Sequence, residues 1–396
     1  MLKGIKIKLN PTKEQELLFW KSAGISRWAY NYHLGRNKEN YENGGKYLKD
    51  NVTRKEITQL KKTDEYKWLN EVGSNVIKQA VKDCNTAFAK FFSKESKFPR
   101  FKSKYKTKPS FYVNYESLSK TKNGFKGEKL GEVKTWTTLP DLPEGQKYYS
   151  NPHISFDGHN WFLSIGIEYQ EKQIETTSTV IGIDLGIKEL AVCSDGYTYK
   201  NINKTKEVKR LKKKLKKEQR KLSKIIEDKI IDYKVAGKKR YPIFVRPLRE
   251  CKNYIKQAKK VNLIYKRLTN IRTNYLHQTT RAIVNRYPKA IVLENLKVQN
   301  MMKNHHLART IAEQSFYEFR RQIEYKARLL GIDVAFVRTM YPSSKTCSCC
   351  GHIKKDLTLK DRIYVCSKCG LEIDRDYNAS LNLADCYINQ HDLIKK

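Results

Sequence analysis

The sequence predicts a multidomain chain that combines an α+β region with an α/β region. Its length of 396 residues exceeds what one ordinary hydrophobic core holds and indicates about two to four domains. Short β-prone runs separated by turn residues follow the first helical patterns, from about residue 108 to 170. After residue 179, apolar strand-like runs alternate with long helical patterns, which is typical of an α/β domain.

The charge of the chain indicates a polyanionic partner. Lysine and arginine number 80 against 41 acidic residues, for a formal net charge of +39 and a pI near 9.7. The 39% hydrophobic content still suffices for globular packing, and 25 tyrosines together with the lysines favour nucleic acid over a membrane surface. The sequence has no apolar run of about 18 residues and no apolar signal-peptide core, so we expect a soluble, intracellular protein located in the cytoplasm.

The first hundred residues are expected to be one strand followed by helices. Residues 2–9 alternate apolar and basic side chains, as in a half-buried strand. Thr12 and Gln15 have the spacing of a capping box, and a further helical pattern runs from about Val76 to Phe92.

The β-prone runs that follow predict a small antiparallel barrel or sheet, with a hairpin turn at Asp157-Gly158. The strand at residues 2–9 would complete this barrel. The helices from 11 to about 105 would then be an insertion into it.

The run TVIGIDLGIKELAV, from Thr179 to Val192, places the carboxylate of Asp184 inside an apolar strand. With a period of two, Asp184 shares one strand face with Gly182 and Gly186. The missing side chains would leave room for a phosphate or a metal ion. The alternative is a strand that ends in a solvated aspartate before a turn.

A basic segment, Lys204 to Lys224, carries twelve lysines and arginines against two glutamates. Apolar residues with heptad-like spacing predict a helix with one packed seam, paired antiparallel with a helix from Cys251 to about Tyr275. Either this charge is a solvated helix face, or the helix contacts an RNA or DNA backbone. The candidate contacts in this helix are Lys212, Lys213, Lys216, Lys217 and Arg220.

A second buried carboxylate is expected at Glu294. The four apolar residues before it, Ala290 to Leu293, predict a strand buried on both faces. An unpaired buried charge is costly, so an acid at this position needs a function. A helix from about Ala308 to Leu330 and a strand from Ile332 to Val337 are expected next.

The cysteines indicate a metal site. The pairs Cys347-x-x-Cys350 and Cys366-x-x-Cys369 have the spacing of a four-cysteine zinc ribbon, and the alternative is a redox pair. Four sulfur ligands leave no open position, so the Zn²⁺ would be structural and contribute on the order of 10 to 16 kcal/mol to folding. Cys349 is an alternative ligand for this site. The remaining thiols are expected to be ordinary: Cys84, Cys193, Cys251 and Cys386.

A third acid, Asp376, precedes a C-terminal helical pattern. Alone it would be a helix N-cap. Together with Asp184 and Glu294 it completes a set of three separated carboxylates that can hold two Mg²⁺ ions about 3.5 to 4 Å apart for phosphodiester hydrolysis. Asp374, two residues earlier, is the rival third ligand.

These motifs, in this order, resemble the TnpB family of insertion-sequence proteins, which are RNA-guided DNA nucleases related to type V CRISPR effectors. The resemblance rests on IGIDLGIKELAV, IVLENL, YPSSKTCSCCG, YVCSKCG and DRDYNASLN, with support from KIKLNPTKEQELLFW and KFPRFKSK near the N-terminus. It therefore spans nearly the whole chain.

The resemblance implies a RuvC-like nuclease domain of RNase H fold with Asp184, Glu294 and Asp376 as catalytic Mg²⁺ ligands. It implies a wedge-type β-barrel at 1–10 and 106–176, with a helical recognition insertion at 11–105. The nuclease domain would comprise 177–340 and 374–396 and would contain a helical hairpin insertion at about 204–285. A zinc-ribbon insertion that binds target nucleic acid would lie at 341–373. A transposon-derived guide RNA would pair with double-stranded target DNA beside a short flanking motif, in a prokaryotic cell. Lys78 and Gln79 are candidates, by position, for reading that motif.

Three other functions agree with the same residues. The chain could be a miniature type V CRISPR effector, a guide-dependent DNA-binding repressor or transposition accessory that does not cut, or a plain zinc-ribbon RNA-binding protein. The three intact acids favour a nuclease. The oligomeric state stays open, because the helical hairpin could pack internally or against a second copy.

Overall fold

The computed structural model describes residues 2–104, 106–169, 174–237, 239–339, 341–358, 361–389 and, for the backbone, 394–395. The chain divides into two compact units, Met1–Gln170 and Glu171–Lys396. Within the described residues, no helix combines the length and apolar character that crossing a membrane requires.

The first unit contains a seven-stranded antiparallel sheet with the strand order β2-β6-β7-β1-β5-β4-β3. Strand β1 pairs with β7 along most of its length and with β5 at its end, so it links the two halves of this sheet. The N-terminal strand thus joins the β region, as the alternating pattern predicts. The strands are β1 (Leu2–Asn10), β2 (Ser110–Tyr112), β3 (Ser119–Lys120), β4 (Gly124–Gly127), β5 (Gly131–Thr135), β6 (Ser150–Phe156) and β7 (Trp161–Glu168).

Helices inserted between β1 and β2 cover this sheet. The first helix begins at the predicted capping box, where the Thr12 side chain accepts from the Gln15 amide. Phe19 of this helix is fully buried against Phe111 and Trp161 of the sheet, with ring centroids 5.8 and 5.2 Å away. The helical elements are α1 (Lys13–Glu42), α2 (Asp50–Leu60), the 3₁₀ helix η1 (Asp64–Glu71) and α3 (Ser74–Phe92), with a short 3₁₀ turn η2 (Tyr115–Ser117) after β2.

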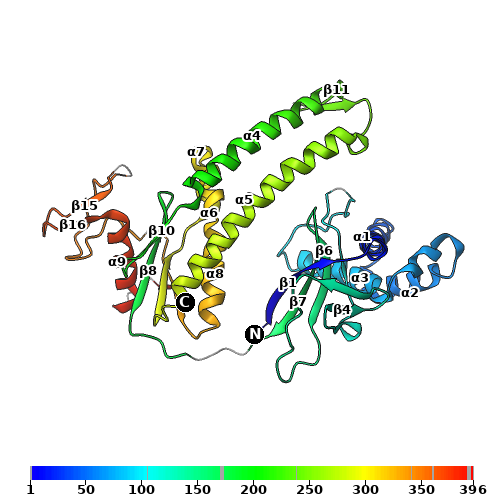
Figure 1. Cartoon of the computed structure of the whole chain (residues 1–396), viewed down its shortest axis with the longest axis horizontal. Helices are drawn as coiled ribbons and strands as arrows, with labels where there is room; N and C mark the ends of the chain where they lie inside the picture. Colours follow the sequence, from blue (N-terminus) through cyan, green and yellow to red (C-terminus); the bar gives the residue numbers. More distant parts are fainter. Residues whose placement is uncertain are drawn as a thin grey trace. The chain divides into compact units, whose positions relative to one another are not determined.

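The second unit is built on a six-stranded mixed sheet with the order β10-β9-β8-β13-β14-β17. The central strands β8, β13 and β14 are parallel, and β9 and β17 pair antiparallel with them (Figure 1). The strands are β8 (Val180–Leu185), β9 (Glu189–Cys193), β10 (Thr198–Lys200), β13 (Ala290–Glu294), β14 (Asp333–Val337) and β17 (Ile394–Lys395).

Helices lie on both faces of this sheet. On one face, α5 (Lys252–Val284) and α8 (Phe316–Arg328) cover Ile181, Ile183 and Leu293. On the other face, α9 (Arg375–Ile388) packs Leu383 and Cys386 against Val292. This layered α/β arrangement buries the parallel strands on both sides, as their apolar runs predict.

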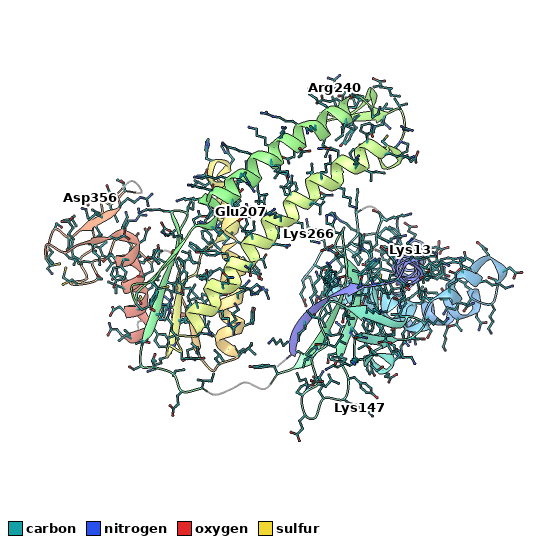
Figure 2. The ribbon with its side chains drawn as sticks, viewed as in Figure 1. Lys13, Lys147, Glu207, Arg240, Lys266 and Asp356 are labelled. Atoms are coloured by element: carbon teal, nitrogen blue, oxygen red, sulfur yellow. The ribbon has the colours of Figure 1, made fainter. Side chains whose placement is uncertain are left out.

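The predicted helical hairpin is present and packs internally. Helix α4 (Lys206–Glu227) buries Val208, Leu211 and Leu215 against α5. Between them the structure has a two-stranded ribbon, β11 (Ile230–Ala236) and β12 (Lys239–Phe244), where the glycine and prolines predict only a break. Arg240 lies at the far end of this hairpin (Figure 2). Short 3₁₀ turns η3 (Ile202–Lys204) and η4 (Leu248–Glu250) precede α4 and α5.

The prediction of a single helix from about Ala308 to Leu330 is wrong. The chain forms two helices there, α7 (His305–Gln314) and α8, preceded by a short helix α6 (Val298–Met301). Ser315 separates them because its backbone is left-handed, with φ of 57°. This break lets the C-terminal end of α7 reach the loop after β8 while α8 packs on the sheet.

Candidate functional site

Asp184 and Glu294 lie at the carboxyl ends of two neighbouring parallel strands. The residues just before them, Ile183 and Leu293, are direct partners in the β8–β13 pairing. These two apolar side chains point into the core shared with α5 and α8. Because successive side chains alternate between faces, Asp184 and Glu294 both point to the opposite face, which α9 covers.

Helix α9 lies directly on β8 at Gly182. A side chain at this position would place its Cβ 2.0 Å from the Ser380 carbonyl oxygen and 2.6 Å from the Ala384 nitrogen. The expectation that the missing side chain leaves room for a phosphate or metal is therefore wrong at Gly182. The glycine instead allows close helix–strand packing, which brings the first turn of α9 to the two strand-borne acids.

Asp374 and Asp376 have different roles at the start of α9. Asp374 is the N-cap, and its Oδ1 accepts from the backbone amides of Asp376 at 2.9 Å and Tyr377 at 3.0 Å. The alternative that Asp376 is itself the cap is therefore wrong. Asp376 lies in the first turn of α9, and its carboxylate takes no part in the cap.

Arg375 contacts the third acid and was not identified from the sequence. Its Nη2 and Nε donate to Oδ1 of Asp376 at 2.9 and 3.2 Å, and both side chains are largely buried. A cation placed between two aspartates in DRD is the signal that would have indicated this contact. The guanidinium lowers the local negative charge that the clustered acids create.

The electrostatics show that the acids lie within interaction range. Burial, followed by the negative charges of Asp376 and Glu294, raises the pKa of the Asp184 carboxyl to about 7, while Arg375 acts in the opposite direction. Burial also raises the pKa of Glu294. A divalent cation would compensate this repulsion, so the carboxylate set suits metal binding.

The three carboxylates do not form a closed ligand cluster in this structure. Among the described residues, only the four cysteines bring their ligand atoms within 4.8 Å of one another. Asp184 and Glu294 share a sheet face, and Asp376 lies on the helix that covers it. The three interact electrostatically, but they do not form a ligand cluster as close as that of the cysteines.

The four predicted cysteines converge as a metal site. Sγ of Cys347 lies 3.6 Å from Sγ of Cys369, and the same distance separates Cys350 from Cys366. A tetrahedral zinc ion bound about 2.3 Å from each sulfur would place the sulfurs about 3.8 Å apart, so the cluster fits Zn²⁺. The alternative ligand Cys349 is exposed and outside the cluster.

The two turns of the cysteine cluster share one geometry. Gly351 donates its amide to the Cys347 carbonyl and Gly370 donates to the Cys366 carbonyl, and both glycines have positive φ, 71° and 75°. Backbone hydrogen bonding, first from Cys369, lowers the pKa of the Cys366 thiol to about 6 and so favours the thiolate. Strand β15 (Ile363–Val365), before the second turn, pairs antiparallel with β16 (Glu372–Asp374) after it, and β16 leads into α9.

Two asparagines of α9 fasten it to the cysteine-bearing segment. Asn378 donates to the Thr346 carbonyl at 2.7 Å and accepts from the Ser348 amide at 3.0 Å. Asn382 donates to the carbonyls of Ser343 and Thr346 at 2.8 and 2.7 Å. Both asparagines are buried, so the cluster and the helix that carries Asp376 are tied together.

The candidate nucleic-acid contacts differ in availability. Lys213, Lys216, Lys217 and Arg220 are exposed on α4. Lys212 is half-buried and its Nζ pairs with Glu313 of α7 at 2.5 Å. In the first unit, Lys78 is exposed on α3, and the neighbouring Gln79 donates to Asp83 at 2.8 Å.

Family models match three parts of the chain. Residues 164–305 match OrfB_IS605, described as a probable transposase, and residues 1–46 match the helix-turn-helix domain of the same group. Residues 316–383, which include the four cysteines, match the Cas12f1-like TNB domain.

Similar proteins cover nearly the whole chain. A putative RNA-guided DNA endonuclease of Streptomyces pristinaespiralis is 30% identical over 384 residues, which is 96% of this chain and 88% of that protein. The putative RNA-guided DNA endonuclease InsQ of Escherichia coli K12 is 28% identical over 96% of this chain and 91% of its own length. A cryo-EM structure of a Cas12f1–sgRNA–target DNA complex contains a chain with the same fold, with a TM-score of 0.57 at 14% identity, covering 100% of this chain and 99% of that one. The protein belongs to the TnpB family of transposon-encoded proteins.

Proposed function

We propose that this protein is an RNA-guided DNA endonuclease of an insertion sequence. A guide RNA derived from the transposon end would pair with one strand of a double-stranded DNA target beside a short flanking motif. The relatives from Streptomyces and Escherichia are named putative RNA-guided DNA endonucleases and are similar over almost their full lengths. The net charge of +39 agrees with a partner made of RNA and DNA.

The mixed sheet of the second unit would be a RuvC-like nuclease domain of RNase H fold, formed by 177–340 and 374–396. The segment 341–373 would be a zinc-bearing insertion that binds target nucleic acid. In the first unit, 1–10 and 106–176 would form a wedge-type barrel and 11–105 a helical recognition insertion. These assignments agree with the strand order, with the helices between β1 and β2, and with the four-cysteine cluster.

The observation that supports the proposed reaction is that Asp184 and Glu294 end two neighbouring strands, while Asp376 lies in the first turn of the helix that covers their sheet face, within electrostatic range of Asp184. Two Mg²⁺ ions held by Asp184, Glu294 and Asp376 would activate a water and stabilise the leaving oxygen of a phosphodiester. Asp184 and Glu294 are fixed by central strands, whereas Asp376 lies on a helix that the close approach at Gly182 positions. Arg375 would orient the Asp376 carboxylate and neutralise part of its charge until the ions bind.

The cysteine cluster would hold a structural Zn²⁺ without an open coordination position. Its structural role agrees with a ligand set that consists of four sulfurs and contains no carboxylate. Exposed basic side chains such as Lys213 and Lys216 would bind the phosphates of the guide–target duplex. Such contacts carry no sequence information. Lys78 and Gln79 stay candidates for reading the flanking motif.

The decisive experiment begins with the RNA that copurifies with the protein, because its sequence identifies the guide. Cleavage of a matched duplex is then measured with Mg²⁺, with a mismatched duplex and a reaction without Mg²⁺ as controls. We expect Asp184→Ala, Glu294→Ala and Asp376→Ala each to abolish cutting while RNA binding is retained, because metal ligation and backbone contact involve different residues.

A wild-type protein that binds guide and target but does not cut would overturn the nuclease proposal in favour of a DNA-binding accessory. If Asp184→Ala changes neither binding nor cutting, a plain zinc-ribbon RNA-binding protein becomes the better description. A guide that comes from a repeat array instead of a transposon end would identify a miniature CRISPR effector.

A further inference from the structure

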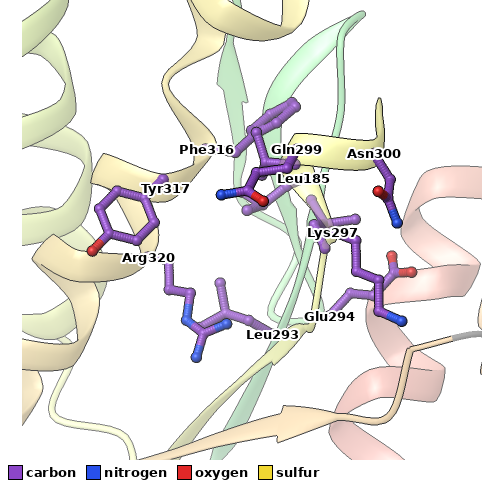
Figure 3. A pocket seen from close by; sticks show the side chains of 11 residues that line it. Leu185, Leu293, Glu294, Lys297, Gln299, Asn300, Phe316, Tyr317 and Arg320 are labelled. Carbon is purple, nitrogen blue, oxygen red and sulfur yellow. The ribbon is translucent and has the colours of Figure 1, made fainter. Parts of the chain in front are cut away.

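A pocket of about 310 Å³ opens beside Glu294 within the second unit. It lies between the carboxyl ends of β8 and β13, the segment that contains α6, and the start of α8. Figure 3 shows Tyr317 and Arg320 on the α8 side and Glu294, Lys297 and Asn300 on the other. Its volume is at the lower end of the roughly 300–1,000 Å³ range of small-ligand sites.

The lining combines an apolar floor with a polar rim. Leu185, Leu293 and Phe316 supply apolar surface, and Phe316 is 2% exposed. Gln299 and Asn300 present amide groups at the rim. This combination suits a nucleobase, which has apolar faces and a hydrogen-bonding edge.

One wall of the pocket is held rigidly by Arg320. Its Nη1 donates to Asn295 Oδ1 at 2.9 Å and its Nε donates to Glu324 at 3.0 Å, while the guanidinium lies 3.7 Å from the ring centroid of Phe336. Lys297, on the opposite side, is exposed. Arg320 is paired with Glu324, so the exposed Lys297 is the cation that favours a ligand carrying phosphate.

The position of the pocket relative to the acids restricts the identity of its ligand. Of the three acids, Glu294 lines the pocket, and the apolar floor comes from Leu185 and Leu293 on the opposite strand face. A DNA strand whose phosphate lies at Glu294 therefore has an adjacent nucleoside within reach of this opening.

We propose that the pocket holds the nucleoside that flanks the scissile phosphate of the DNA strand being cut. The apolar floor receives the base, the amides of Gln299 and Asn300 reach its edge, and Lys297 contacts the neighbouring phosphate. This inference rests on the proposed nuclease function, because it assigns a substrate subsite to that reaction. Insertion of a base positions the adjacent phosphodiester against the acids and so contributes to orientation.

The test is a scan of the cut site with abasic substrates. After the cut position is mapped, a tetrahydrofuran residue replaces one nucleoside at a time on either side of it, and single-turnover cleavage is measured with guide RNA and Mg²⁺. We expect one position directly beside the cut where loss of the base slows cleavage about tenfold, in the range of losing one protein–base contact. Replacements several nucleotides away leave the rate unchanged.

A filling variant links this position to the pocket. Gln299→Trp places bulk in the opening, so it slows cleavage of the intact substrate and removes the difference between intact and abasic DNA. Met302→Trp is the matched control, because Met302 lies on the same segment, is 43% exposed and does not line the pocket. Met302→Trp should keep both the cleavage rate of intact DNA and the slower cleavage of abasic DNA. A melting curve of each variant verifies folding.

The outcomes separate the subsite from the nuclease function. A wild type that cuts every abasic substrate at the same rate overturns the subsite and leaves the nuclease function intact. An abasic effect that persists unchanged in Gln299→Trp shows that the base binds elsewhere, and so also overturns the proposal. A wild type that binds matched DNA but cuts none of the substrates overturns the nuclease function and the subsite with it.

Discussion

The carboxylate of Asp374 accepts a hydrogen bond from the backbone amide of Asp376 at 2.9 Å, so Asp374 caps the helix that carries Asp376. A side chain whose oxygen is engaged by two backbone amides contributes to helix stability. This division of roles distinguishes Asp376, which the sequence predicts as the third ligand, from Asp374, its rival for that position.

Substitution of these two aspartates should separate stability from cutting. We expect Asp374→Ala to lower the free energy of unfolding by about 1 kcal/mol, the cost of losing an N-cap, while keeping most of the cleavage rate. Asp376→Ala should abolish cleavage with a smaller change in stability. Urea unfolding and cleavage assays on both variants test this. Complete loss of cutting in a well-folded Asp374→Ala protein would return Asp374 to the ligand set.

Gly182 should tolerate no side chain. A Cβ there would lie 2.0 Å from a carbonyl oxygen of α9, so Gly182→Ala must displace this helix. The displacement should lower the free energy of unfolding by about 1–3 kcal/mol and move Asp376 away from Asp184 and Glu294. We expect a lower melting temperature and strongly reduced cleavage. Gly186→Ala is the milder control, since its Cβ would lie 3.2 Å from the nearest atom. Equal effects of the two substitutions would contradict the close packing at Gly182.

The raised pKa of Asp184 predicts a pH-dependent stability before magnesium binds. The folded carboxyl keeps its proton up to a pH of about 7, compared with an ordinary value of 3.8, so the folded state binds more protons in this window. Stability therefore falls as the pH rises from about 4 to about 7.

Asp184→Asn provides the comparison, because it stays neutral throughout. Melting curves without magnesium should show the wild type losing stability relative to this variant between pH 5 and 7, and added Mg²⁺ should restore the wild type only. Parallel pH profiles for the two proteins would show that burial and neighbouring acids do not perturb Asp184.

Removing one sulfur ligand should lower stability and release zinc. Cys366→Ser is expected to reduce the bound zinc, measured by elemental analysis, and to lower the melting temperature, because metal binding supplies folding free energy. Cys349→Ser is the matched control, since this thiol lies outside the cluster and is exposed. Loss of zinc from the Cys349 variant alone would assign the ligands differently.

The exposed basic residues of α4 should determine the salt dependence of RNA binding. Replacing Lys213, Lys216, Lys217 and Arg220 with glutamine should weaken binding and reduce the slope of log K against log salt by up to about 0.7–0.9 per lost phosphate contact. Replacing the three lysines with arginine keeps the charge and should preserve the slope. An unchanged slope in the glutamine variant would identify this side of α4 as a solvated face.

The sequence indicates the strand-borne acids because their physical signals are local. A period of two places Asp184 on a strand face, and four apolar residues before Glu294 require a buried strand. The cysteine spacing likewise identifies all four sulfur positions. Each of these depends on neighbours in the chain, so no tertiary information is needed.

The remaining features depend on contacts between distant segments. The left-handed backbone of Ser315 follows no glycine or proline signal, so the break between α7 and α8 was not predicted. The space beside Gly182 is filled by the backbone of α9, which lies about two hundred residues later in the chain, so the residues around Gly182 do not indicate this contact. Nor does a single sequence reveal the pocket beside Glu294, which needs the folded positions of β8, β13 and α8.

The amide contacts of Asn378 and Asn382 join the cysteine-bearing segment and the last helix into one structural unit. Both side chains donate to main-chain carbonyls near the first cysteine pair. These contacts therefore depend on the path of the backbone in this segment and not on its surface side chains. Engineering a smaller or differently targeted member of this family therefore has a natural boundary before Ser343. A graft that starts after the second cysteine pair would separate these asparagines from their acceptors and leave the third acid without its anchor.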